Sequence, residues 1–591
     1  MGTISDKLMR IINTKEDIRQ ALISKGYDVP TSIPFKEYAK MISDLPCRVD
    51  SFPDIEGIVA RYSALGLTNE QMAANPVWVD KTGNGHDLQM KNFAWKEGSG
   101  ISDIYPGALV FDGVDDWGGC DNLPLLPKEK GYSIIALRNW ITRYDATQYK
   151  RPLISNLDTN DEGAFLIEYR KDENVNDVTG SYNSFTDVYI DDNNPITWQT
   201  SSSYNGQIIK KGTSKSTNKL CICKTYFGQL SNYANAAIWE LIILDHDATE
   251  EELTKIKDYF VKTYPWLFPD QAWTVTGKTN EDEDRATIAN ITGNGNDLVL
   301  SNFGFAEGSG YGLYAENYAG GRWVQSTDRA DLTWTSYSVN ITSVKVASTQ
   351  LYYQSYPKQP SFTVPSYKIK VYGLKDGQTL SYKQVTSEGQ QIYKISEDGI
   401  YTLPSFLFKA NGDWYGFTLD KIQETCDITI EQIPEYEGYL VTDGVDDKVV
   451  SAESIAFTDT WTIITDTVFL GKVSVASGIL ASNIFTVYNY QGSGTIAVTM
   501  GEGGSSLRVI TSSIKAFSSD GTIYDAEWNE YHVEIGTIRA LERLLKIGTS
   551  SNETSYFCQL AFKFLGIYNN QILSKDDCIK AYNYLQTLKA K

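Results

Sequence analysis

A short aspartate-rich motif occurs twice in the sequence, as Asp112-Gly-Val-Asp115-Asp116 and as Asp443-Gly-Val-Asp-Asp447. Several carboxylate oxygens this close together could bind calcium, and Asp112, Asp115 and Asp116 are the candidate ligands. Alternate residues of a strand point to opposite faces, however, so these carboxylates need not converge. Aspartate before glycine also commonly accepts hydrogen bonds from turn amides. Both interpretations remain open, and the structural turn is the favoured one.

Aromatic residues are a second source of chemistry, because the chain has 38 Tyr and 13 Trp. Such rings can stack on sugar faces while their polar atoms form hydrogen bonds, and they are also common strand and interface residues. For any single ring a place in the core or at an interface is the favoured alternative. The candidates for ligand binding at turns or loop edges are Trp95, Trp117, Trp140, Trp198 and Tyr204.

The sequence contains few residues and no common motif suited to catalysis. The chain has 3 His, and His86 is matched by Asn296 in the repeat described below. No H-E-x-x-H, P-loop or G-x-S-x-G motif is present, and no strand carries acids in the E-x-D-x-E pattern of some sandwich glycosidases. We therefore expect a protein that is not an enzyme, with no cofactor unless calcium binds.

Charge and hydropathy exclude two classes of partner. A net charge of −21 repels phosphate backbones, so we expect no nucleic acid. The longest apolar run, 236–244, contains Glu240 and is far shorter than the roughly 20 residues that span a bilayer, so we expect no membrane segment.

The sequence contains an internal duplication. Thr82-Gly-Asn-Gly-His-Asp-Leu88 recurs 210 residues later as Thr292-Gly-Asn-Gly-Asn-Asp-Leu298, and Asn92-Phe93 and 97–100 recur at the same separation. The two aspartate motifs are 331 residues apart, so 121 residues were added to the second copy. Each copy ends in a predicted helix, one capped by Thr249 and one by Ser574.

Short alternating segments separated by turns predict a mainly β chain built from β-sandwiches, one in each copy. The added segment is also β-rich: 367–372 alternates strictly, and the following Lys375-Asp-Gly-Gln is predicted to form a hairpin turn. We therefore predict an Ig-like sandwich inserted into the second large sandwich. The predicted domains are 1–47, 48–270, 271–310 with 438–591, and the inserted 311–437.

Residues 1–47 differ from the rest because they are predicted to be helical. Two short helices bury too little apolar surface to fold alone, so we interpret them as an attachment or oligomerisation module. A cap on the neighbouring domain is the alternative. The candidate attachment residues are Ile11, Ile18, Leu22, Phe35, Tyr38 and Ile42.

Three features together resemble laminin-G-like, concanavalin-type jelly rolls. They are the segment 80–88, the segment Ala108-Leu-Val-Phe-Asp-Gly-Val-Asp-Asp-Trp117, and the acidic helix that follows them. The resemblance covers about 50–270 and, in two pieces, about 271–310 and 438–591. The second copy departs from the pattern at Thr442, which replaces Phe, and at Lys448, which replaces an aromatic residue. These departures put a ligand site shared by both copies in doubt.

The N-terminal stretch 11–26 with Pro34-Phe-Lys-Glu-Tyr-Ala39 is similar to a module that opens virion proteins of crAss-like and related gut phages, and 372–378 and 396–401 are similar to their inserted β-domains. The resemblance implies a virion protein, made in the host cytoplasm, of the head-fibre, tail-fibre or adhesin type. Its implied partners are capsid, portal or tail proteins and further copies of itself, with a trimer expected by analogy. The hypotheses are a structural fibre component, an adhesin for host capsular polysaccharide and, least favoured, a polysaccharide-degrading enzyme.

Overall fold

The computed structural model describes the chain from residue 52 to residue 590, with gaps. The gaps are 127–130, 143–149, 159–164, 171–182, 187–195, 201–216, 229–231, 294, 307, 320–322, 325–327, 348, 355–360, 376, 410–411, 420, 424, 472–476, 483–484, 490–494, 502–505, 537–543 and 550–556. The predicted helical module and its six attachment residues, Ile11, Ile18, Leu22, Phe35, Tyr38 and Ile42, lie outside the described residues, as does Tyr204. Of Trp198 only the backbone is described.

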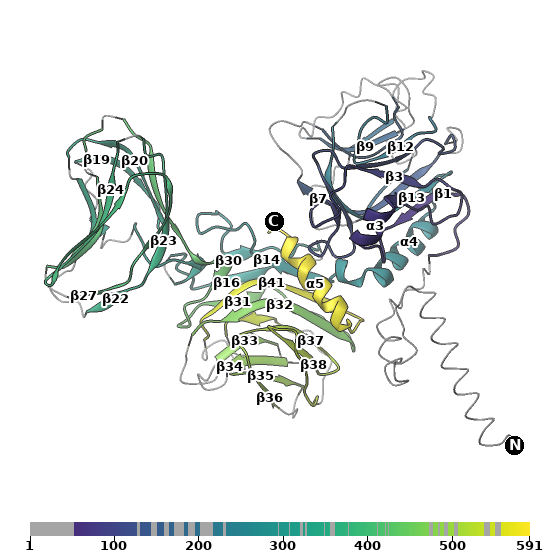
Figure 1. Ribbon diagram of the computed structural model, residues 1–591. Coiled ribbons are helices and arrows are strands. Elements are labelled where there is room, and N and C mark those ends of the chain that lie inside the picture. The colour runs from purple at the N-terminus through teal and green to yellow at the C-terminus, as the bar shows by residue number, and fades with distance from the viewer. Residues whose placement is uncertain are drawn as a thin grey trace, which may run out of the picture. The chain divides into compact units, whose positions relative to one another are not determined.

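The chain is mainly β, as predicted, and its strands form layered sandwiches (Figure 1). It divides into two compact units that change over between Pro265 and Trp266. No helix among the described residues is long and apolar enough to cross a membrane.

The first unit is a sandwich of a six-stranded and a seven-stranded sheet. The first sheet has the order β11-β7-β13-β5-β4 with β1 on β13, and the second has the order β10-β9-β8-β12-β6-β3-β2. The strands of the first sheet are β1 Ile58–Ser63, β4 Gly100–Ile101, β5 Leu109–Asp112, β7 Ser133–Thr142, β11 Ile196–Thr200 and β13 Asn235–Leu244. Those of the second are β2 Val77–Trp78, β3 Leu88–Lys91, β6 Trp117–Cys120, β8 Lys150–Ser155, β9 Phe165–Arg170, β10 Asn183–Thr186 and β12 Leu220–Ile222. The apolar core between the sheets includes Trp78, Phe111, Trp140 and Ile238.

Two helices accompany this sandwich, α3 (Asn69–Ala74) and α4 (Glu250–Thr263). The predicted cap of α4 is confirmed: the Thr249 hydroxyl accepts a hydrogen bond from the Glu252 amide, and the Glu252 carboxylate accepts one from the Thr249 amide. This capping box satisfies amides that have no partner within the helix.

The second unit contains the other jelly roll, which pairs two eight-stranded sheets. One sheet consists of β14 Gln271–Thr274, β17 Gly310–Leu313, β30 Glu435–Val441, β32 Trp461–Phe469, β37 Ile514–Ser518, β38 Thr522–Asp525, β39 Glu530–His532 and β41 Leu560–Asn569. The other consists of β15 Thr287–Ile288, β16 Leu298–Ser301, β31 Lys448–Ser451, β33 Ser477–Ala481, β34 Phe485–Asn489, β35 Thr495–Met500, β36 Ser506–Ile510 and β40 Lys546–Ile547. The short helix η1 (Pro265–Leu267) precedes β14, and α5 (Lys575–Thr587) begins at the predicted cap Ser574, which accepts a hydrogen bond from the Asp577 amide.

Between β17 and β30 lies a smaller sandwich of two five-stranded sheets around its own core. Its first sheet holds β18 Trp323–Val324, β21 Thr349–Gln354, β24 Leu380–Thr386, β25 Gly389–Ile395 and β28 Trp414–Leu419, and its second holds β19 Ala330–Trp334, β20 Ser338–Val344, β23 Tyr367–Tyr372, β26 Gly399–Leu403 and β29 Ile428–Ile433. A two-stranded sheet pairs β22 Phe362–Val364 with β27 Phe406–Phe408.

The hairpin predicted at Lys375 is wrong. A turn forms there, with the Gln378 amide donating to the Lys375 carbonyl over 2.9 Å, but β23 and β24 do not pair with each other. Strand β23 pairs with β26 and β29, whereas β24 pairs with β25 and β28. The turn therefore connects the two layers of the sandwich, because a local turn motif does not determine which sheet the next strand joins.

Candidate functional site

The aspartate motif forms the same hydrogen-bonded turn in both copies. Asp112 Oδ1 accepts from the amides of Val114, Asp115 and Asp116 at 2.8, 3.3 and 3.3 Å, and Asp116 Oδ2 accepts from the Asp112 amide at 3.0 Å. Asp443 repeats all of these bonds in the second copy. Each turn therefore uses its own carboxylates to satisfy its own amides.

A second repeated loop fastens this turn. Asn92 donates from Nδ2 to the Asp115 carbonyl at 2.9 Å, and Asn302 makes the same bond to the Asp446 carbonyl at 3.0 Å. Asn92 and Asn302 have φ near 70°, in the left-handed region that asparagine tolerates better than most residues. The structure thus brings together two motifs that the duplication had marked separately.

Burial changes the acidity of one carboxyl in each turn. Asp116 and Asp447 are fully buried, and burial raises the pKa of each to about 6. Hydrogen bonds from Ser99 and from the Asp112 amide oppose this rise at Asp116, and Ser309 and the Asp443 amide do so at Asp447. Each of the two carboxyl groups therefore holds its proton more tightly than an exposed aspartate does.

The calcium interpretation can be tested on this geometry. Three carboxylate groups offer oxygen atoms within 4.8 Å of one another at Asp112, Asp115 and Asp116, and again in the second copy. Calcium takes six to eight oxygen ligands. Here Asp112 Oδ1 is occupied by three amides, and Asp116 is buried with a raised pKa. The carboxylate oxygens that remain are too few to ligate a calcium ion well. The geometry therefore favours the structural turn.

The loop around His86 is also built from backbone contacts. Tyr62 donates its hydroxyl to the His86 carbonyl at 2.6 Å, and Trp273 donates its indole N–H to the Asn296 carbonyl at 3.0 Å. Strand pairing places Tyr62 and Trp273 at equivalent positions. The imidazole is not needed for this contact, so the exchange of His86 for Asn296 preserves the loop.

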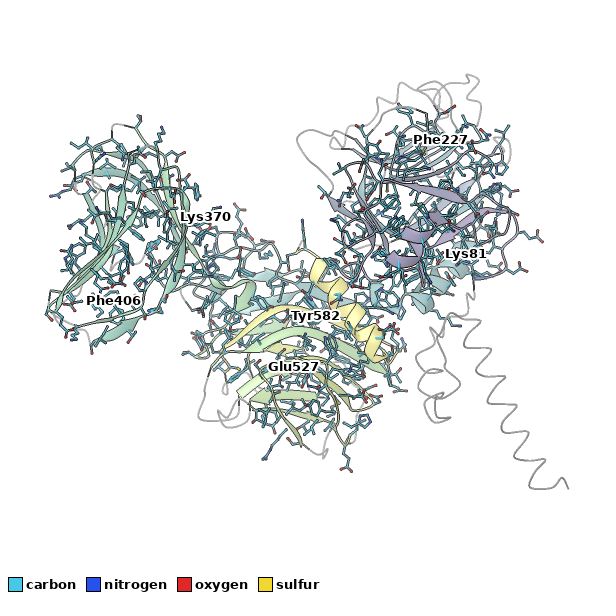
Figure 2. The ribbon with its side chains drawn as sticks, viewed as in Figure 1. Lys81, Phe227, Lys370, Phe406, Glu527 and Tyr582 are labelled. Atoms are coloured by element: carbon cyan, nitrogen blue, oxygen red, sulfur yellow. The ribbon has the colours of Figure 1, made fainter. Side chains whose placement is uncertain are left out.

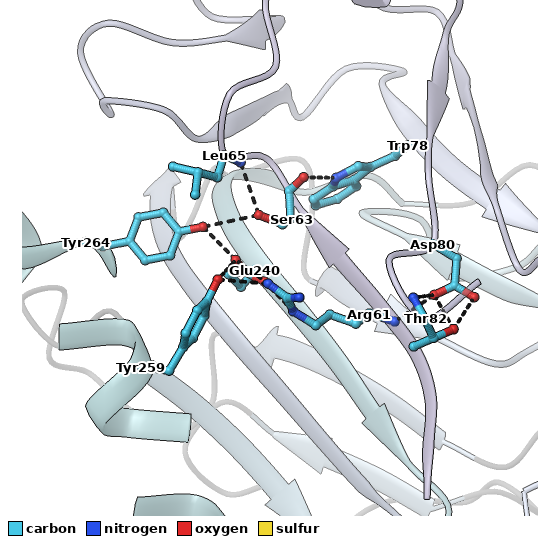
Figure 3. Close-up of polar contacts among 9 residues, drawn as sticks. All are labelled: Arg61, Ser63, Leu65, Trp78, Asp80, Thr82, Glu240, Tyr259 and Tyr264. Carbon is cyan, nitrogen blue, oxygen red and sulfur yellow. Dashed lines mark hydrogen bonds and ion pairs between the residues drawn. The ribbon is translucent and has the colours of Figure 1, made fainter. Parts of the chain in front are cut away.

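A buried charge network lies between β1, β13 and α4 (Figure 3). Arg61 donates to both carboxylate oxygens of Glu240 at 3.3 Å, while Tyr259 and Tyr264 donate to Glu240 Oε1 at 3.1 and 2.7 Å. Glu240 is 0% exposed and Arg61 4%. Burial raises the pKa of Glu240, and Arg61 opposes that rise.

This network is closed to solvent. The ring of Phe52 lies 4.1 Å from the Arg61 guanidinium, and Tyr259 lies on the helix side. A substrate has no path to a carboxylate with no exposed surface. The network therefore holds α4 and the N-terminal end of the described chain against the sheet, and we assign it no catalytic role.

The three aromatic candidates whose side chains the structure describes, Trp95, Trp117 and Trp140, do not form one site. Trp140 is 3% exposed and belongs to the core, so its prediction as a ligand residue is wrong: its strand is buried along most of its length. Trp95 packs against the same core, stacked on Phe93 with ring centroids 4.7 Å apart. Trp198 pairs through its backbone with Ile135, and its side chain lies outside the described part, as Tyr204 does entirely.

Trp117 is the one candidate with a described side chain that lies in a half-exposed polar and aromatic cluster. The ammonium of Lys224 is 4.0 Å from the centroid of the Trp117 ring, and Phe227 meets that ring edge-on at 5.7 Å. Lys219 lies 4.9 Å from the Phe227 ring. Sequence reasoning missed Lys224 and Phe227, because they are more than a hundred residues from Trp117 and only strand pairing brings β6 and β12 together.

No family model and no curated protein matches the chain. Among solved structures, a Trypanosoma rangeli sialidase in complex with sialic acid is 10% identical over 51% of this chain and 68% of that chain, with a TM-score of 0.20. The N-terminal tandem CBM22 domain of Paenibacillus barcinonensis Xyn10C is 10% identical over 45% of this chain and 99% of that chain, with a TM-score of 0.14. Likeness at this level carries no conclusion about activity or ligand.

Proposed function

We propose that this chain is a non-enzymatic structural protein of a phage virion, a component of a head or tail fibre. It would attach through its N-terminal residues to capsid, portal or tail proteins and display its β-domains outward as a homo-oligomer, by analogy a trimer. The resemblance of 11–26 and 34–39 to the opening module of gut-phage virion proteins supports the virion assignment.

One structural observation carries the non-enzymatic part of the proposal. The polar residues that recur in both copies are engaged in holding loops, as Asp112 and Asp443 do with three amides each. Groups held in this way are poor candidates for proton transfer or nucleophilic attack, which need a carboxylate free to reach substrate. The duplicated sandwiches are then display modules.

Deletion of residues 1–47 tests the attachment role. We expect the shortened chain to fold and to be absent from purified particles, because the proposed contact with the particle is gone. The matched control removes the inserted 315–433 with a short linker, which should leave incorporation intact. Normal incorporation of the N-terminal deletion would overturn the attachment role.

The second candidate function is an adhesin that binds host capsular polysaccharide. The half-exposed ring of Trp117, beside Lys224 and Phe227, favours it, because aromatic faces flanked by polar groups suit sugar rings. Binding of the full chain to a glycan array, lost in Trp117→Ala, would support this function. A polysaccharide-degrading enzyme remains the least favoured candidate, and release of reducing ends from host capsule by the purified chain would establish it.

A further inference from the structure

The cluster around Trp117 is a special feature of the first copy. On β6, a Cβ on Gly118 would meet Met90 of the core, so Gly119 faces the opposite side of the sheet. A Cβ on Gly119 would come within 2.7 Å of the Trp117 ring and 3.0 Å of the Phe227 ring. Glycine within a strand commonly marks a place where another group approaches closely. Here it leaves room for the rings of Trp117 and Phe227, which meet edge-to-face beside it; Phe227 is labelled in Figure 2.

The second copy shows that the fold does not need this arrangement. Pairing of β6 with β12 and of β31 with β40 aligns Trp117 with Lys448 and Gly119 with Val450. The same alignment places Thr549 where the first copy has Lys224. The second copy thus lacks the counterparts of Trp117, Gly119 and Lys224 together. Their joint absence indicates that these three residues serve one function.

Lys224 is a buried cation with few partners among the described residues. It is 7% exposed, and burial lowers its pKa. Its ammonium has three donors, yet among the described residues it makes one long hydrogen bond, 3.4 Å to the Phe227 carbonyl, and lies on the Trp117 ring. No carboxylate in the described chain forms an ion pair with it, in contrast to Lys278, which is equally buried and pairs with Asp284 at 2.7 Å. A buried ammonium without an anion costs folding free energy.

We propose that Trp117 and Lys224 form a subsite for a sugar ring that carries an anionic group, a carboxylate or a sulfate. The anion supplies the partner that the ammonium lacks, and the sugar ring packs on the aromatic cluster. A glycan is favoured over an acidic peptide because flat rings and a single cation match a charged pyranose. The inference rests on the adhesin function proposed above and narrows its ligand to acidic polysaccharides.

The test is calorimetric titration of the full chain with four probes: oligogalacturonate for carboxylate, a heparin-derived oligosaccharide for sulfate, a neutral dextran oligosaccharide, and a polyglutamate peptide. We expect one or both acidic oligosaccharides to bind and the neutral one to bind at least about tenfold more weakly. Lys224→Thr, which installs the residue of the second copy, should remove this preference, and Lys224→Arg should keep most of it. The matched control is Lys515→Thr, because Lys515 also lies over aromatic rings, those of Trp528 and Tyr582, in the second copy.

The outcomes separate the two proposals. Equal binding of neutral and acidic probes, or acidic binding unaltered in Lys224→Thr, overturns the anionic subsite and leaves glycan binding standing. No binding of any probe overturns the subsite and counts against the adhesin function as well. Equally tight binding of a polyglutamate peptide overturns the assignment to a glycan. Unaltered hydrogen exchange of β6 and β12 in Lys224→Thr establishes that a lost affinity does not reflect unfolding.

Discussion

Arg61 and Glu240 form a buried ion pair where the second jelly roll has two apolar residues. Pairing of β1 with β13 and of β14 with β41 aligns Arg61 with Ala272 and Glu240 with Phe564. Ala272 and Phe564 are both 0% exposed. The same sandwich therefore closes on its helix with or without charge, which agrees with the finding that well-packed apolar residues often replace buried ion pairs without loss of stability.

This alignment predicts a non-additive pair of substitutions. Arg61→Ala should lower the free energy of opening of β13 by about 3–5 kcal/mol, because it leaves the buried Glu240 carboxylate without its cation. Adding Glu240→Phe, which completes the residues of the second copy, should recover part of that loss. Hydrogen exchange of β13 peptides in the full chain measures both. Additive losses would show that the ion pair does not act as a unit.

The second prediction concerns pH. Burial raises the pKa of Asp116 and Asp447 to about 6, above the value near 4 of an unfolded chain. The folded chain then binds protons more tightly between about pH 4 and 6, so the contribution of these groups to stability is full below that window and is lost as pH rises through it. The contribution is about 3 kcal/mol per group.

Replacing both residues, Asp116→Asn with Asp447→Asn, should flatten this dependence. The melting temperatures of the variant and the wild type are measured from pH 4 to pH 7. The difference, variant minus wild type, should rise with pH. Asp115→Asn with Asp446→Asn is the control, because these aspartates are exposed in the same turns. A difference that stays constant across the range would show that the buried carboxyls titrate normally.

The third prediction tests the contact of Tyr62 with the His86 carbonyl. Tyr62→Phe removes the hydroxyl donor and should lower the stability of the 80–88 loop by about 1–2 kcal/mol. His86→Asn, which installs the residue of the second copy, keeps the carbonyl and should change little. Hydrogen exchange in peptides covering 80–91 compares the two. An equal loss in both variants would assign the imidazole a role that the repeat does not indicate.

Local patterns predicted what the two copies share. The spacing of Asp112, Gly113 and Asp116 predicted a turn that satisfies its own amides, and the capping residues Thr249 and Ser574 predicted where two helices begin. These features form between residues that are close in the sequence, so they could be predicted from the sequence alone.

Contacts between distant residues could not be predicted in this way. Arg61 meets Glu240, and Trp117 meets Lys224, only because strands far apart in the sequence pair in one sheet. Trp140 as a candidate ligand-binding residue and the hairpin at Lys375 were wrong for a related reason, because both depend on how distant strands pack into sheets. The strand pairing of the two copies aligns Lys224 with Thr549, but their sequences do not, because 221–227 and 546–552 share only Ile222 and Ile547.

The last prediction concerns the base of the inserted sandwich. Glu316 is buried there and accepts hydrogen bonds from the Tyr415 hydroxyl at 2.5 Å and from the Trp323 indole at 3.2 Å. Its backbone pairs with the side chain of Gln432, which accepts from the Glu316 amide and donates to its carbonyl. The outgoing and returning segments of the insertion are thereby joined by one residue pair.

Glu316→Ala should therefore destabilise the inserted sandwich by about 2–4 kcal/mol, because two buried donors lose this acceptor. Hydrogen exchange should quicken in β18, β28 and β29 and stay unchanged in β41, which belongs to the core of the second jelly roll. Glu397→Gln is the control, since Glu397 is exposed in the same sandwich. Equal acceleration in β41 would mean that the insertion and its host jelly roll unfold as one cooperative unit, against the separate cores that the structure contains.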